Sequence, residues 1–176
     1  NNIKSWRTKD GMPLYTMQGH TGDIFRIAFH PDNKVLASIS IDKTVREWQV
    51  NKGILLHTID GYTEQMCGIT FSSDNASLIV GAKDSMYLWR IFDGVLLRTF
   101  AKTTGPAIQK FAITPDGKII ATILQKKMRI WDASSGDLLC ALEGHSEEIE
   151  SVVFSPDGKI LASSSQDGTV RLWGVL

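Results

Sequence analysis

Tryptophan recurs along this chain at a nearly constant interval, and this period restricts the possible folds more than any other feature. Trp6, Trp48, Trp89, Trp131 and Trp173 are separated by 42, 41, 42 and 42 residues. The residues before each tryptophan form short runs rich in β-branched and aliphatic side chains, bounded by turn residues, which is typical of β-strands. The chain is therefore expected to be built from copies of one small all-β unit.

The clearest copy covers residues 144–173 and shows how many strands one unit contains. Turns at Asp157-Gly158 and Asp167-Gly168 divide it into three short strands, because Asp-Gly supplies the positive φ that tight hairpins need. A fourth strand follows a glycine five residues after each of the first four tryptophans, in the stretches MPLYTM, ILLHTI, VLLRTF and DLLCAL. A period of about 40–45 residues with four strands in each unit indicates a β-propeller blade.

The sequence thus predicts an all-β fold, a β-propeller of four-stranded antiparallel blades, as a single domain or partial propeller over residues 1–176. It contains four repeats, at about 19–59, 61–100, 103–142 and 144–176, plus one extra N-terminal strand at Met12–Met17. Residues 1–18 form a partial unit, in which IKSW is expected to be a third strand. The last repeat stops after its third strand.

The repeats resemble the Trp-Asp (WD) repeat family over essentially the whole chain. Gly19-His20 and Gly144-His145 match the Gly-His pair of that family, and Trp131-Asp132 is its Trp-Asp pair. The turn residues recur in phase with the five tryptophans, which makes the resemblance specific. It implies a propeller whose usual role is to bind other proteins.

The resemblance also implies a hydrogen-bonded tetrad that locks a blade, made of a histidine, a serine, a turn aspartate and the tryptophan. A buried carboxylate needs donors, and imidazole, hydroxyl and indole N–H groups supply them. A hydrolase triad uses similar residue types, but recurrence in phase and a tryptophan donor favour the structural interpretation. The expected tetrads are His20, Ser40, Asp42 and Trp48 in the first repeat, and His145, Ser165, Asp167 and Trp173 in the fourth.

Partner contacts in the family concentrate at positions three and five after the histidine and at the residue before the turn aspartate. Phe25 and Ile41 stand out among these positions because an aromatic side chain beside an aliphatic one is typical of a binding hot spot. The alternative is that both fill the channel mouth. The predicted partner-binding face consists of Asp23, Phe25, Ile41, Gln65, Lys83, Gln109, Gln125, Glu148, Glu150 and Gln166.

Composition limits the classes of partner and cofactor. The formal net charge is zero, with 19 basic and 19 acidic residues, so nothing favours nucleic acid or an anionic membrane. No apolar run is long enough to span a bilayer. His30 and His57 are expected to be surface or edge histidines, and no cofactor or metal site is expected. Cys67 and Cys140 are too few for a disulfide framework, which suggests a cytoplasmic location.

One main function and two alternatives fit this sequence. The first is a non-catalytic protein–protein interaction scaffold. The alternatives are an enzyme with its site in the central channel, or a sensor or regulatory propeller domain of a larger protein. A channel enzyme needs ionisable residues at equivalent inner positions, and the inner strands offer Arg26 and Glu150 but no repeated set. The sequence therefore favours the scaffold.

Propellers of this family commonly close with seven or eight blades, and this chain holds four repeats. It is expected either to be part of a longer propeller or to form a homodimer that completes an eight-bladed ring. An open arc would expose two apolar blade faces and unpaired strand edges. Light scattering distinguishes the two-chain ring from other states.

Overall fold

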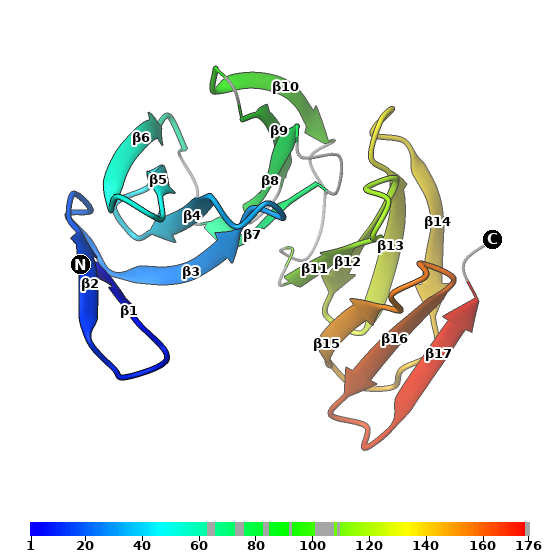
Figure 1. Cartoon of the computed structure of the whole chain (residues 1–176). Coiled ribbons are helices and arrows are strands. Elements are labelled where there is room, and N and C mark those ends of the chain that lie inside the picture. The colour runs from blue at the N-terminus through cyan, green and yellow to red at the C-terminus, as the bar shows by residue number, and fades with distance from the viewer. Residues whose placement is uncertain are drawn as a thin grey trace.

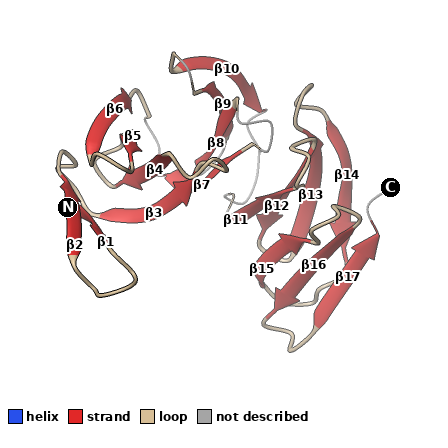
Figure 2. Ribbon diagram, viewed as in Figure 1, coloured by secondary structure: helices blue, strands red, loops and turns tan. Residues whose placement is uncertain are grey.

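The computed structural model describes residues 1–62, 66–72, 76–82, 85–91, 93–100, 108 and 110–174. All regular elements in these residues are β-strands, drawn in red in Figure 2. They form one two-stranded, three four-stranded and one three-stranded antiparallel sheet. The predicted all-β propeller architecture is confirmed.

The N-terminal sheet and the first blade come from the first 59 residues. The N-terminal sheet pairs β1 (Ile3–Trp6) with β2 (Pro13–Met17), the two strands expected of the partial unit at residues 1–18. The first blade has the strand order β3-β4-β5-β6. Its strands are β3 (Ile24–Phe29), β4 (Val35–Ser40), β5 (Val45–Gln49) and β6 (Ile54–Ile59).

The other repeats follow the same order from the inner to the outer strand. The second blade consists of β7 (Met66–Phe71), β8 (Ser77–Ala82), β9 (Met86–Arg90) and β10 (Val95–Phe100). The third consists of β11 (Lys110–Ile113), β12 (Ile119–Leu124), β13 (Lys127–Asp132) and β14 (Leu138–Glu143). The fourth has only β15 (Ile149–Phe154), β16 (Ile160–Ser165) and β17 (Val170–Gly174), as expected from the sequence.

The turns after the inner strands repeat one local geometry. In the first, third and fourth repeats the aspartate of this turn accepts a hydrogen bond from the backbone N–H two residues later: Asp32 from Lys34 at 2.8 Å, and Asp116 from Lys118 and Asp157 from Lys159, both at 3.1 Å. Gly158 has a φ of 72°, and Asn33 holds the corresponding position at 60°. This left-handed conformation favours glycine and asparagine, which explains the recurring Asp-Gly and Asp-Asn pairs.

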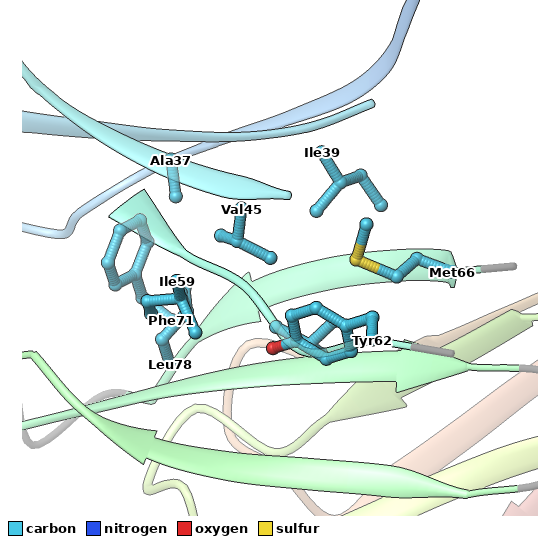
Figure 3. Close-up of a cluster of buried hydrophobic side chains, with 9 residues drawn as sticks. Ala37, Ile39, Val45, Ile59, Tyr62, Met66, Phe71 and Leu78 are labelled. Carbon is cyan, nitrogen blue, oxygen red and sulfur yellow. The ribbon is translucent and has the colours of Figure 1, made fainter. Parts of the chain in front are cut away.

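Side chains of adjacent blades form the hydrophobic core. Figure 3 shows the cluster between the first two blades, where Ala37, Ile39 and Val45 of the first blade face Phe71 and Leu78 of the second. Further clusters join the second blade to the third and the third to the fourth repeat. Met17 of β2 packs against Leu36 and Trp48, which fixes the N-terminal sheet to the first blade. Nearly every residue of the second strands β4, β8 and β12 is consequently buried.

The sheets lie side by side in an open arc, with the N-terminal sheet and β17 at opposite ends (Figure 1). In the described residues β2 pairs with β1 and not with β17. Leu172 on β17 is 69% exposed, whereas Ile130, the corresponding residue before the tryptophan of the third repeat, is only 7% exposed. Ile27 and Phe29 on β3 are also exposed. The arc therefore ends in apolar faces, as the sequence predicts for an open ring.

Candidate functional site: the loop face and channel of the arc

A continuous hydrogen-bonded chain links the inner loop to the third strand in the first repeat. His20 Nδ1 lies 2.9 Å from Asp42 Oδ2, and His20 Nε2 lies 2.8 Å from Ser38 Oγ. Trp48 Nε1 donates to the same Ser38 oxygen at 2.8 Å. The ionised Asp42 carboxylate can only accept, so Nδ1 of a neutral imidazole is the donor and Nε2 accepts from Ser38.

Local electrostatics support this arrangement of protons. Burial lowers the pKa of His20, and the Asp42 carboxylate only partly opposes that shift, which favours the neutral imidazole. Burial alone would raise the pKa of Asp42, but hydrogen bonds from Thr44, His20 and the backbone of Thr21 hold it well below its usual range. The aspartate stays ionised while the histidine stays neutral, so the hydrogen bonds of this tetrad keep one arrangement. We call this hydrogen-bonded tetrad the polar brace.

The fourth repeat repeats this chain almost atom for atom. His145 Nδ1 lies 2.8 Å from Asp167 Oδ2, and His145 Nε2 lies 2.9 Å from Ser163 Oγ. Trp173 Nε1 donates to Ser163 at 2.9 Å. Asp167 also accepts from the Thr169 hydroxyl and the backbone of Ser146, which lowers its pKa.

The structure corrects the serine of both tetrads. Ser40 and Ser165 were expected to join His and Trp, but Ser38 and Ser163 do so, two residues earlier on the same strand face. Ser40 Oγ instead accepts from the backbone N–H of Asp42 at 3.1 Å, and Ser165 Oγ accepts from that of Asp167 at 3.2 Å. These two serines close the turn and lie too near it to meet the tryptophan.

The third repeat keeps part of the tetrad. Trp131 Nε1 donates to Thr122 Oγ1 at 2.9 Å, and Thr122 holds the position of Ser38. The signal was present in the sequence: a hydroxyl residue lies four positions before the turn aspartate, or its replacement Lys126, in three of the four repeats.

The second repeat replaces the polar brace with an aromatic cluster. Val80 holds the position of Ser38, and buried Trp89 Nε1 has no hydrogen-bond partner among the described residues. Tyr62 stands where the histidine is expected, with its ring 5.8 Å from Trp89 and 5.4 Å from Tyr87. Burial raises the pKa of Tyr62, so its hydroxyl remains protonated. This blade depends on packing rather than on hydrogen bonds.

Backbone hydrogen bonds hold several residues of the predicted partner-binding face. Ile41 N–H donates to Asp23 O at 3.0 Å, and Gln166 N–H donates to Glu148 O at 2.9 Å. A further backbone hydrogen bond at this face joins two repeats: Ile149 N–H donates to Gln125 O at 2.9 Å. Three other members of the predicted partner-binding face, Gln65, Lys83 and Gln109, lie outside the described residues.

Phe25 and Glu150 of this face sit at β-bulges, which the sequence did not reveal. The register of β3 shifts between Ile24 and Arg26, and that of β15 shifts between Ile149 and Ser151. A bulge re-aims the side chain of the extra residue. Phe25 is half-buried against the core between the first two blades, and Ile41 is 57% exposed.

The two histidines outside the tetrads have different environments. His57 on β6 is exposed, in agreement with an edge position, and its Nδ1 lies 3.0 Å from Glu47 Oε2. His30 is buried, so its expected surface or edge position is wrong: its ring packs edge-on against Phe71, at 5.1 Å, between two blades. The described residues contain no His, Cys, Asp or Glu cluster that could hold a metal ion. No helix in that part of the chain could span a bilayer.

Comparison with known proteins shows which family these repeats resemble. The WD domain, G-beta repeat, matches residues 11–49 and 136–174, the two stretches that end with the complete tetrads. Periodic tryptophan protein 2 of Arabidopsis thaliana is 30% identical over 178 residues, which cover 98% of this chain and 19% of that protein. Protein HIR1 of Eremothecium gossypii is 25% identical over 181 residues, covering 96% of this chain and 18% of that protein.

A third relative is shorter. Guanine nucleotide-binding protein subunit beta of Schizosaccharomyces pombe is 29% identical over 101 residues, which cover 56% of this chain and 32% of that protein. The chain thus spans about a fifth of the length of the first two relatives and matches about a third of the last one. Repeat period, tetrads, blade topology and these matches agree that the chain belongs to the WD-repeat β-propeller family.

Proposed function

We propose that this chain is a non-catalytic platform that binds a protein partner through the loop face defined by Asp23, Phe25, Ile41, Gln125, Glu148, Glu150 and Gln166. The observation that carries the proposal is the exposure of Ile41 on a turn that a backbone hydrogen bond to Asp23 ties to the loop before β3. A rigid apolar anchor binds with little loss of conformational entropy. Such anchors near the centre of an interface supply most of its binding energy.

The loops of this face are pre-organised by the tetrads beneath them. In the first repeat Asp42 accepts from the Thr21 backbone at 2.9 Å and from His20, so the loop before β3 is tied to the turn that carries Ile41. In the fourth repeat Asp167 ties the corresponding loop through Ser146. The polar brace therefore serves the binding face rather than a reaction.

The relatives and the chain's charge favour a protein partner. WD-repeat propellers generally bind proteins, and one relative is by its name a subunit of a guanine nucleotide-binding protein. The net charge of zero offers no general attraction for nucleic acid. Burial raises the pKa of Cys67 in the channel to about 11, which is unfavourable for a thiolate nucleophile.

Affinity capture from cell extract, followed by binding of the purified partner, tests the platform. The double variant Phe25→Ser with Ile41→Ser is expected to weaken partner binding at least tenfold and to remain folded, with a lower melting temperature because Phe25 packs against the core between the first two blades. Leu96→Ser with Leu138→Ser, two exposed apolar positions on outer strands, is the matched control and should bind normally. Equal loss in both double variants would refute this face, and unfolding of the first would show that its side chains are core.

A further inference from the structure

A cavity of about 320 Å³ opens at the centre of the arc, between the inner strands of all four repeats. Its lining includes Arg26 from β3, Gly68 and Ile69 from β7, Lys110 and Phe111 from β11, and Ser151 from β15. Arg26 and Lys110 are the charged residues of this lining, and no acidic residue lines the cavity in the described structure. In a chain with zero net charge, the cavity is thus locally cationic.

The residues that line this cavity lie at one level of the four inner strands. Arg26, Gly68 and Ser151 each follow the register shift of their strand, and Lys110 starts its own strand. A Cβ atom on Gly68 would lie 2.6 Å from Cε1 of Phe111, so the ring packs directly on the glycine backbone. The Phe111 ring therefore occupies the space that a side chain at position 68 would need, and it forms an apolar wall of the cavity.

The Arg26 guanidinium has unused donor capacity. Its Nη1 donates to the backbone oxygen of Phe25 at 2.9 Å, and it forms no ion pair with any residue that the structure describes. Guanidinium carries five N–H donors, so most of them remain available to a ligand. Arg26 on β3 and Cys67 on the neighbouring strand β7 both line the cavity.

Lys110 is only partly neutralised. Its Nζ contacts the backbone oxygen of Glu150 and lies 3.8 Å from the Glu150 carboxylate. The other carboxylate oxygen of Glu150 accepts from Gln166 Nε2 at 2.5 Å, on the loop face. Arg26 and Lys110 line the cavity, whereas the single carboxylate near them, that of Glu150, does not, so a net positive charge remains toward a ligand there.

We propose that this cavity binds an anionic side chain of the protein partner, a glutamate carboxylate or a phosphorylated serine. The proposal rests on the platform function and names the chemistry that the platform recognises. The Arg26 fork matches a carboxylate or phosphate in a bidentate geometry, and Lys110 adds a second point charge. Ile69 and Phe111 contact the methylene groups behind the anion. The volume is at the lower end of ligand sites and suits one side chain.

Nuclear magnetic resonance titration of the ¹⁵N-labelled 176-residue chain tests the cavity with three small probes. N-acetylglutamate amide and N-acetyl-O-phosphoserine amide present the two anions, and N-acetylglutamine amide is the neutral control. The amides of Gly68 and Gly81, both in contact with Phe111 at the cavity wall, are expected to shift with either or both anionic probes and not with the neutral one. A response to one anion alone identifies the group that is recognised.

Arg26→Gln and Lys110→Gln should each reduce the affinity for the responding probe at least fivefold, and the affinity should fall with salt. Lys52→Gln, at an exposed turn outside the cavity, is the matched control and should change nothing. An equal response to the neutral probe, or unchanged affinity in both cavity variants, would overturn the proposal. The probe titration requires no partner protein. A negative titration therefore does not count against the capture result, and a failed capture does not count against the titration.

Discussion

The first and second blades share a fold but are stabilised by different interactions. In the first, Trp48, Ser38, His20 and Asp42 form one chain of hydrogen bonds. In the second, Val80 and Tyr62 replace the serine and histidine, and Trp89 is partly buried, with no hydrogen-bond partner for its buried Nε1 among the described residues. The strand order and spacing survive this exchange. The tetrad is therefore not needed to form a blade; it fixes the loops that the blade presents.

The largest expected effect comes from breaking the brace in the first blade. Ser38→Ala leaves both Trp48 Nε1 and His20 Nε2 buried without a partner, at roughly 1–3 kcal/mol for each group. Urea unfolding should therefore show a loss of about 2–4 kcal/mol. Ser40→Ala removes only a turn acceptor and should cost about 1 kcal/mol. Equal losses would contradict the assignment of Ser38 to the tetrad.

The third repeat should respond about half as strongly. Thr122→Val keeps the volume of the side chain but removes the acceptor of Trp131 Nε1, a single buried group. A loss of about 1–2 kcal/mol in the free energy of unfolding is expected. A loss as large as that of Ser38→Ala would show that the residue in the histidine position of this repeat also depends on Thr122.

Restoring an acceptor in the second blade tests the comparison in the opposite direction. Val80→Thr places a hydroxyl where Ser38 stands in the first blade, so Trp89 Nε1 gains a partner. Val45→Thr is the control, because Val45 is equally buried in the same cluster without such a donor beside it. Val80→Thr should cost about 1 kcal/mol less than Val45→Thr in the same unfolding measurement. Identical costs would indicate that Trp89 already has a partner.

The repeat period and turn residues were sufficient to predict the blades, because Asp-Gly turns and alternating apolar runs act locally. The choice between two serines was not predictable from one repeat, since Ser38 and Ser40 share a strand face and chemistry. The bulge at Phe25 and the exposed methylenes of Ile41 depend on how neighbouring loops meet. The charge of the channel depends on four strands far apart in sequence, which no single repeat reveals.

The smallest expected effect concerns Glu47, which stands before its tryptophan where the other repeats carry Leu88, Ile130 and Leu172. Its side chain is buried, one carboxylate oxygen has no partner among the described residues, and the other is paired with His57. Burial raises the pKa of Glu47, and His57 only partly opposes this. The folded state thus holds the Glu47 proton more tightly than the unfolded state, so this contribution to stability is present at acidic pH and lost as pH rises through the folded pKa.

Glu47→Gln should therefore stabilise the chain near neutral pH, by less than about 1 kcal/mol because an amide also needs partners, and have no effect near pH 3. Glu143→Gln breaks an exposed ion pair with Lys127 instead and should slightly destabilise the chain at neutral pH. Thermal unfolding of both variants between pH 3 and pH 8 measures the difference. A Glu47→Gln variant that loses stability at neutral pH would show that the ion pair with His57 outweighs the cost of burying the Glu47 carboxylate.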